Sequence, residues 1–294
     1  MRRLRPVASE ILLKEKLDAL VATFDASTIA PDPLELALAQ RDPRDQEVAA
    51  LLAAAFAYGR ADIVVANVGG VLAKMQPSPA AWLAAMTSSG RFDRRRASRT
   101  FAGFRHRFHK APDLVALLER IALAIERHGS LGALFRTVYR DGDEDIAPSL
   151  QRFVEALIAI EGAAPPTPAL RYLLTSPADG SACKRMNLFL RWMVRREAPD
   201  LGLWDFVDPS KLIMPLDTHV HRIATFLGLN ARKSADWKTA KALTTRLARF
   251  DAQDPVRYDF AICRLGILDL CSRKRKKEQC DACLLRDVCR FPVG

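Results

Sequence analysis

Apolar residues along this chain recur at helical spacing, and neither alternating strand-like runs nor Asn-Gly turns stand out. Asp42 and Pro43 form a strong helix start, because an aspartate can cap free N–H groups and a proline fits the first turn. The run that follows predicts a helix over 48–56. The same periodicity predicts helices at 112–127, 146–160, 184–196, 218–227, 235–250 and 255–268. Together these elements predict an all-α fold.

Two stretches interrupt the helical pattern and are expected to be loops. One is the proline-rich segment 163–168. The other is the basic segment 90–99, which carries Arg91, Arg94, Arg95, Arg96 and Arg99. A basic loop either contacts a phosphate backbone or simply faces water, and the sequence leaves both interpretations open.

The charge balance indicates a polyanionic partner. The 294 residues include 45 Lys+Arg against 34 Asp+Glu, which gives a formal net charge of +11. Nucleic acid and an anionic membrane face both fit such a charge. No apolar run approaches the roughly 18 residues that cross a bilayer, and acidic residues interrupt the N-terminal segment, so we expect a cytoplasmic, nucleoid-associated protein without a membrane partner.

Four of the six cysteines gather near the C-terminus, at Cys271, Cys280, Cys283 and Cys289. In a reducing cytoplasm such a group is expected to bind metal rather than to form disulfides. Zinc sites commonly show two Cys-x2-Cys pairs and this chain has one, which favours a [4Fe–4S] cluster and leaves zinc as the alternative. Cys183 and Cys263 stand apart, and no role is assigned to them.

A basic loop separates the first two of these four cysteines. Its cationic residues are Arg273, Lys274, Arg275, Lys276 and Lys277. A metal site would hold both ends of the loop, which lowers the entropy cost of binding a phosphate backbone. The alternative is a solvated tail.

A turn rich in small residues, with Gly180 and Ser181, leads into the helix predicted to start at Lys184. Free N–H groups at such a helix start suit a DNA phosphate. The helical period sets apolar residues on one face and Lys184, Asn187, Arg191 and Arg195 on the other. Asp217 occupies the N-cap of the helix at 218–227. On these grounds alone, Lys184 is a surface lysine and Asp217 only a cap.

Two motifs resemble a known family. Residues 216–228 read LDTHVHRIATFLG and resemble the V-D-T-H-x-x-R-V motif of the helix-hairpin-helix DNA glycosylase superfamily, which includes endonuclease III and adenine glycosylase. That superfamily also carries C-x6-C-x2-C-x5-C around a [4Fe–4S] cluster, and only the first interval differs here. In the superfamily, a helix leads into the cysteine ligands of the cluster, and residues 259–266 (DFAICRLG) occupy the corresponding place in this chain.

The hairpin and the wider chain add to this resemblance. The superfamily hairpin reads L-P-G-V-G-x-K, and residues 180–184 match its first glycine and its lysine, with Ala182 in place of the second glycine. The long interval from Lys184 to Asp217 is similar to that of the archaeal 8-oxoguanine glycosylase branch. Over most of 42–289 the chain also resembles an uncharacterised bacterial family of this superfamily, defined by the run CKRMNLFLRWMVR.

The resemblance implies a two-lobed helix-hairpin-helix glycosylase fold. Residues 1–41 would be a helical segment packed on the cluster lobe, 42–205 a six-helix barrel with the hairpin near 176–184, and 206–294 the lobe with the catalytic aspartate and the cluster. It implies a monomer that removes an oxidised base, 8-oxoguanine first, from double-stranded DNA and cleaves the abasic site as a lyase. The residues concerned are Lys184 and Asp217 for catalysis, Gly180, Ser181, Arg185 and Arg191 with the basic loop for DNA binding, and Tyr58 and Arg60 for the lesion.

Other classes of function are open at this point. A DNA-binding or damage-sensing iron–sulfur module without turnover would keep the fold and the cluster, and the altered hairpin fits such a loss. An iron–sulfur electron carrier or an RNA-modifying protein would explain the cysteines and the charge. Neither of these last two accounts for the motif at 216–228.

Overall fold

The computed structural model describes residues 8–24, 26–274 and 276–291, and these are mostly helical, which confirms the expected all-α class. The α-helices are α1 (Glu10–Thr23), α2 (Glu35–Leu38), α3 (Pro43–Ala55), α4 (Ala61–Leu72), α5 (Pro79–Ala85), α6 (Arg94–Thr100), α7 (Ala111–His128), α8 (Leu131–Val138), α9 (Ala147–Ile158), α10 (Pro168–Leu173), α11 (Lys184–Val194), α12 (Thr218–Phe226), α13 (Trp237–Leu247), α14 (Asp259–Ile267) and α15 (Lys277–Asp281). Short 3-10 turns are η1 (Ala26–Thr28), η2 (Pro177–Asp179), η3 (Pro209–Lys211) and η4 (Arg286–Val288).

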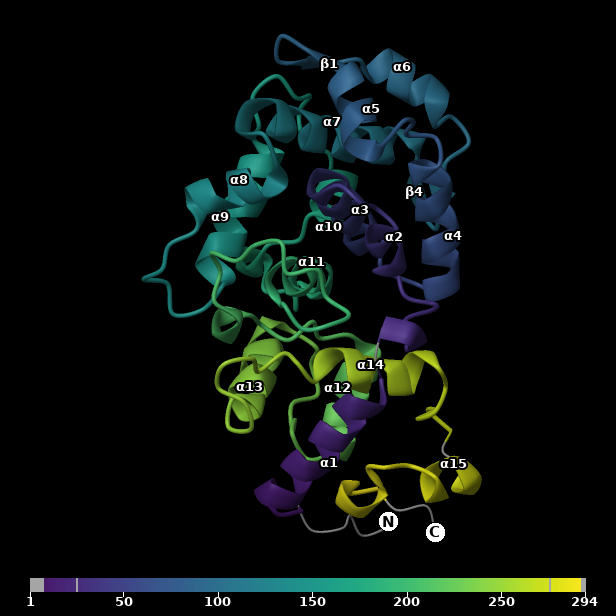
Figure 1. Ribbon diagram of the computed structural model, residues 1–294, viewed down its shortest axis with the longest axis vertical. Helices are drawn as coiled ribbons and strands as arrows, with labels where there is room; N and C mark the ends of the chain where they lie inside the picture. Colours follow the sequence, from purple (N-terminus) through teal and green to yellow (C-terminus); the bar gives the residue numbers. More distant parts are fainter. Residues whose placement is uncertain (1–7, 25, 275, 292–294) are drawn as a thin grey trace.

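Helices α2 to α9 form the upper part of the molecule, and α1 and α12 to α15 form the lower part (Figure 1). The centre of the upper part is α3, which packs on α2, α4, α5, α8 and α11. Its residues from Val48 to Ala55 are completely buried, and its many alanines let these neighbours approach closely. Below it, α12 packs on α14, and α1 packs on α14 and η4. The N-terminal segment is divided between the two parts of the molecule. Its helix α1 belongs to the lower part, whereas α2 packs on α3 and α4 of the upper part.

Helix α11 lies between the two parts and is buried on almost every side (Figure 1). The helical period predicts a polar face with Asn187, Arg191 and Arg195, but all three are buried, with 2%, 2% and 4% exposure. That expectation is wrong because a helix in contact with both parts of the molecule presents no long side to water. Buried arginines must then find carboxylate partners.

The predicted helix ends agree with the structure to within a few residues, and Asp42 caps α3 through the backbone N–H of Arg44 at 2.8 Å. The loop expected at 90–99 is wrong, because α6 occupies most of it. Asp93 caps this helix by accepting from the N–H of Arg96 at 2.9 Å. The structure also contains two short antiparallel hairpins that the pattern does not predict, β1 (Thr87–Ser88) with β2 (Arg91–Phe92) and β3 (Arg105–His106) with β4 (His109–Lys110).

Within the described ranges, no helix combines the length and the apolar character that crossing a membrane requires.

Candidate functional site

A cavity of about 490 Å³ lies where α11, α12 and α14 meet the N-terminal segment. Its size falls in the usual range of about 300–1,000 Å³ for ligand pockets. Lys184 and Asp217, the two catalytic candidates from the sequence, both line it. We call it the central cavity. Its other ionisable residues are Asp32, Arg60, Asp62, Arg191, His219, Asp259 and Cys263.

Lys184 is the first residue of α11 and is half-buried. The chain turns sharply before it, because Cys183 adopts a left-handed conformation with φ of 46°. The Lys184 Nζ donates a hydrogen bond to the carbonyl of Ala57 at 3.0 Å, and Ala57 also lines the cavity. The ammonium group is therefore held at the wall of the cavity rather than free in solvent.

Asp217 caps α12 with only one of its two carboxylate oxygens. Oδ1 accepts from the N–H groups of His219 at 2.8 Å and Val220 at 2.7 Å. Oδ2 lies 3.7 Å from Sγ of Cys263, which burial keeps as a neutral thiol by raising its pKa well above the usual value. A cap and a helix N-terminus both stabilise the anion. One oxygen thus fixes the side chain, and the other remains directed at a weak donor in the cavity.

Close packing of α12 on α14 positions this aspartate. A Cβ built on Gly266 of α14 would overlap the imidazole ring of His219. The ring Nδ1 of His219 is buried without a hydrogen-bond partner, and burial lowers the pKa of His219, so the ring is neutral at neutral pH. Gly266 is required here because no side chain fits between the helices.

We expect Gly266→Ala to destabilise the protein by about 1–3 kcal/mol, since an added methyl in a close-packed contact forces its neighbours apart. Thermal unfolding followed by circular dichroism measures the effect. Gly70→Ala is the matched control, because Gly70 is an exposed residue of α4 with nothing near a built Cβ. There, alanine should stabilise by about 0.5–1 kcal/mol through helix propensity alone. Equal effects of the two substitutions would contradict the packing argument.

Two further carboxylates in the central cavity, Asp32 and Asp259, escaped the sequence analysis. Asp32 comes from the N-terminal segment, and its Oδ1 accepts from the N–H of Leu34 at 3.0 Å. Burial raises the pKa of Asp32, and it raises the pKa of Asp259 to about 6, against the opposing attraction of Arg191. Asp259 begins the segment 259–266, but the sequence assigns no role to either residue, because both reach the cavity only through packing of distant segments.

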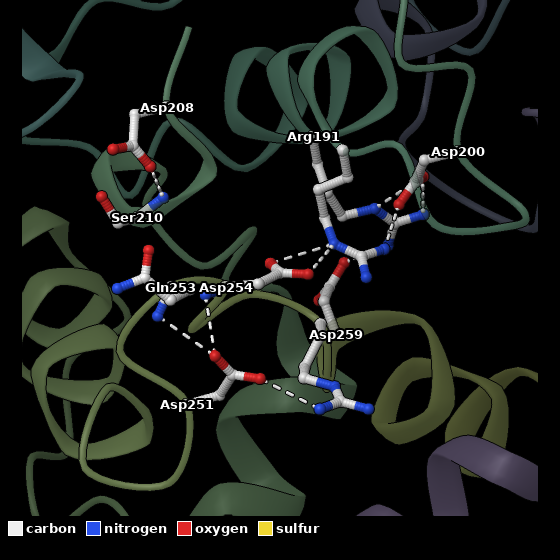
Figure 2. A network of polar contacts seen from close by, with 10 residues as sticks. Arg191, Asp200, Asp208, Ser210, Asp251, Gln253, Asp254 and Asp259 are labelled. Carbon is white, nitrogen blue, oxygen red and sulfur yellow. Dashed lines mark hydrogen bonds and ion pairs between the residues drawn. The ribbon is translucent and has the colours of Figure 1, made fainter. Parts of the chain in front are cut away.

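Asp259 belongs to a buried ionic network around α11 (Figure 2). Arg191 donates to Asp259 Oδ2 at 2.5 Å and to Asp200 Oδ1 at 2.9 Å and 3.1 Å. Arg195 pairs with the other oxygen of Asp200 and with Asp254 at 2.8 Å. The network ties α11 to the start of α14 and so fixes the two walls that carry Lys184 and Cys263.

The raised pKa of Asp259 predicts a pH dependence of stability. A carboxyl that binds its proton more tightly when folded adds stability that is complete below its unfolded pKa and is lost as pH rises through about 6. Between about pH 4.5 and about pH 7.5 this loss is about 2 kcal/mol. Asp259→Asn removes it, so urea unfolding of both proteins at the two pH values should show a difference that changes with pH. A constant difference would contradict the raised pKa.

The two predicted lesion residues lie apart. Arg60 lines the central cavity, is exposed and pairs with Asp62 at 2.6 Å. Tyr58 does not line it. Its ring packs among His106, His109, Phe108 and Tyr172, and its hydroxyl lies 2.5 Å from Nδ1 of His109. Arg60 alone is placed to meet a molecule in the cavity.

Of the residues around α11 that were predicted to contact DNA, two are exposed and two are buried. Gly180 and Ser181 are exposed in the turn before α11. Arg191 is buried in the ionic network described above, and Arg185 is 7% exposed, with its guanidinium bonded to the carbonyls of Ala55 and Tyr172. These two arginines organise the interior instead of presenting charge to a DNA backbone.

The four C-terminal cysteines line one small cavity of about 60 Å³, which we call the cysteine cavity. Its remaining wall is largely apolar and includes Ile223 of α12 and Leu265 of α14. Burial raises the pKa of Cys271, against the opposing positive charge of Arg222, and the other three thiols raise it further. Among the described residues, no group of three or more Cys, His, Asp or Glu side chains is close enough to hold a single metal ion.

The basic loop lies beside this cavity. Arg273, Lys274, Lys276 and Lys277 are exposed, and none of the four forms an ion pair with another residue that the structure describes. Arg275 lies outside the described residues. Arg273 is near enough to the central cavity for its charge to lower the pKa of His219 slightly, after the larger effect of burial. The exposed cations of the loop therefore add positive charge beside the cysteine cavity.

Comparison with known proteins gives one family match. A family described as a protein of unknown function (DUF2400) matches residues 32–268. No curated protein and no solved structure matches the chain. The matched region contains Asp32, Lys184, Asp217 and Asp259 of the central cavity, and the four clustered cysteines follow its end.

Proposed function

The chain belongs to the DUF2400 family, whose function is not established, and we propose that it is a base-excision DNA glycosylase with abasic-site lyase activity. One observation carries this proposal. Lys184 and Asp217 were singled out by separate sequence motifs, and both line the same cavity. A lysine and an aspartate at one pocket are the groups that a Schiff-base glycosylase requires. The fold we propose is that of the helix-hairpin-helix glycosylases.

Lys184 supplies the nucleophile in this proposal. As an amine, its Nζ attacks C1′ of the damaged nucleotide, and the base leaves with the electrons of the glycosidic bond and takes up a proton. Nζ then loses a proton, and its lone pair forms the C1′=N bond as the C1′–O4′ bond of the sugar ring breaks and O4′ takes up a proton. The resulting iminium acidifies C2′, and loss of that proton expels the 3′ phosphate. The ammonium must first lose a proton, and the carboxylates of Asp32 and Asp259 line the same cavity as acceptors.

Asp217 stabilises positive charge on the sugar as the base departs. Its Oδ1 is occupied by two backbone donors, so the side chain cannot rotate freely. Among the described residues, Oδ2 has only the weak thiol donor of Cys263 as a hydrogen-bond partner, and it is therefore the oxygen that acts on the substrate. A preorganised carboxylate costs no reorganisation during the reaction.

The cysteine cavity fits an iron–sulfur cluster. Four thiols surround one small space with apolar walls, and in a cubane cluster each cysteine sulfur binds a different iron atom, so the sulfurs are spread around a volume. Cys271, Cys280, Cys283 and Cys289 would hold it. When bound, it would fix the ends of the basic loop, whose exposed cations would contact DNA phosphates. Zinc is the alternative from the sequence, but a single zinc ion would need the thiols to lie closer together than they do among the described residues.

The test is base release and borohydride trapping by the full chain on duplexes that carry 8-oxoguanine, an oxidised pyrimidine, uracil or an abasic site. We expect free base and a covalent adduct on at least one oxidised duplex, with 8-oxoguanine the first candidate. If the protein binds every duplex but releases no base and forms no trapped adduct, the proposal of an enzyme is overturned. A damage-sensing module would then remain.

A further inference from the structure

The β3–β4 hairpin exposes an aromatic surface next to the central cavity. Phe108, at the tip of the hairpin, is 58% exposed, and Tyr172 of α10 is 42% exposed. Their ring centroids lie 5.0 Å apart, and Phe108 also stacks on Tyr58 at 5.7 Å. We call these three residues the aromatic platform. Exposed aromatic rings side by side are costly in water unless a partner covers them.

The aromatic platform is held rigidly from below. The Tyr58 hydroxyl lies 2.5 Å from Nδ1 of His109, and Nε2 of that histidine is 3.2 Å from the carbonyl of Ala169. The Arg185 guanidinium lies 5.3 Å from the Tyr58 ring and 4.3 Å from the Tyr172 ring. These contacts fix the rings before any ligand arrives, which reduces the entropy cost of binding.

Positive charge surrounds the aromatic platform. The hairpin carries Arg105, Arg107 and Lys110, and Arg171 precedes Tyr172. All four are exposed, and none forms an ion pair with a described residue. The nearest acid in sequence, Asp113, is engaged by the N–H of Lys110 at 2.8 Å. Flat rings framed by cations suit a nucleobase with its flanking phosphates, since bases stack on aromatic side chains and the backbone needs positive charge.

One loop joins the aromatic platform to the central cavity. Ala57 and Gly59 line the cavity, and Tyr58 between them belongs to the platform. Arg107 lies over Gly59, where a built Cβ would be 3.3 Å from its side chain. Lys184 binds the carbonyl of Ala57 from the cavity side. DNA with one nucleotide in the cavity would therefore lie against the platform at the position of the broken base pair.

From this geometry we infer that Phe108 and Tyr172 stack against an unpaired nucleobase of DNA, left without its partner when the damaged nucleotide enters the central cavity. The inference rests on the proposed DNA substrate, but not on turnover. Extrusion of a nucleotide leaves an unstacked base behind, and stacking it on protein offsets part of the cost. The hairpin would thus favour binding to DNA whose pairing is already broken.

Binding to two duplexes tests this inference. One is fully paired, and the other is identical except for 2-aminopurine opposite a tetrahydrofuran abasic-site analogue. Wild type should prefer the second, and stacking should quench its 2-aminopurine fluorescence. Phe108→Ala should weaken the preference by about tenfold and remove the quenching. Phe108→Trp should keep both the preference and the quenching. Ile11→Ala changes an apolar residue of α1 that is 74% exposed, against 58% for Phe108, and should affect neither.

Three results would overturn the inference: an unchanged preference in Phe108→Ala, full retention by Phe108→Leu, which offers bulk without an aromatic face, or no preference in wild type. These results are separate from the fate of the enzyme. If wild type releases no base but Phe108→Ala still loses the preference, the catalytic proposal fails and the stacking role stands. If wild type releases base and Phe108→Ala keeps the preference, only the stacking role fails.

Discussion

Replacing Lys184 with glutamine should abolish the borohydride-trapped adduct while DNA binding is retained. The substitution removes the amine that forms the Schiff base, and it keeps a side chain of similar length that can still donate to the Ala57 carbonyl. Denaturing gel electrophoresis of protein treated with borohydride on the best substrate duplex measures the adduct. The expected change is complete loss, not a reduction.

The matched control is Lys211→Gln. Lys211 is also half-buried, and its Nζ also donates to a backbone carbonyl, that of Asp141 at 2.5 Å, but it does not line the central cavity. It should trap like wild type. An adduct that persists in Lys184→Gln would mean that another amine is the nucleophile.

Asp217→Asn should act on a different step. An asparagine can still cap α12 but carries no charge to stabilise the sugar, so base release should fall by about 10²–10⁴-fold. Trapping on a duplex that already contains an abasic site should fall much less, because no glycosidic bond has to break. Asp236→Asn is the control, since Asp236 also caps a helix, α13, through the N–H of Thr239 and does not line the cavity. Equal losses in both variants would point to capping alone.

The helical period was sufficient to predict most of the long helices. In these helices the apolar residues lie on one side, or a strong capping residue marks where the helix begins. It failed where the sequence is uniformly polar. In α6 the residues Arg94, Arg95 and Arg96 suggest a solvated loop, but Asp93 caps the helix and the buried Ala97 packs it on α7. The two hairpins escaped because each strand has only two residues, too few for an alternating pattern.

The central cavity was predicted only in part. Lys184 and Asp217 lie in recognisable local sequence patterns: Lys184 follows a tight turn, and Asp217 caps a helix. Asp32, Asp259 and Cys263 do not, because their position depends on how the N-terminal segment and α14 pack against α11. Arg191 is another residue whose surroundings depend on tertiary packing and could not be predicted from local sequence. Periodicity placed it on a polar face, but the tertiary fold buries that face and turns a predicted DNA contact into an ion pair.

Helix α14 connects the two cavities. Its start carries Asp259, its middle carries Cys263, and Gly266 contacts His219 beside Asp217. Leu265 of the same helix lines the cysteine cavity, and its carbonyl accepts from the N–H of Cys271 at 2.7 Å. Disorder at the cysteines would therefore be transmitted to the wall that holds Asp217.

Replacing Cys283 with serine should remove the bound group, because three thiols leave one coordination position open. For a [4Fe–4S] cluster, anaerobically purified wild type should show broad visible absorption, and Cys283→Ser should lose it. Salt titrations of duplex binding should then become less steep by about two to four in the log–log slope, since the unpinned loop no longer places its exposed cations on phosphates. Affinity at low salt should fall by about 100-fold.

The control for this substitution is Cys183→Ser, which changes a cysteine outside the cysteine cavity and should keep both the absorption and the salt dependence. A variant with Arg273, Lys274, Lys276 and Lys277 changed to glutamine separates the two roles of the region. It should keep the visible absorption, because the cysteine ligands are intact. Its duplex binding should depend less steeply on salt, because the cations of the loop are gone. Colourless wild type with stoichiometric zinc would replace the cluster by the alternative metal, and an unchanged slope in the glutamine variant would show that the loop does not contact DNA.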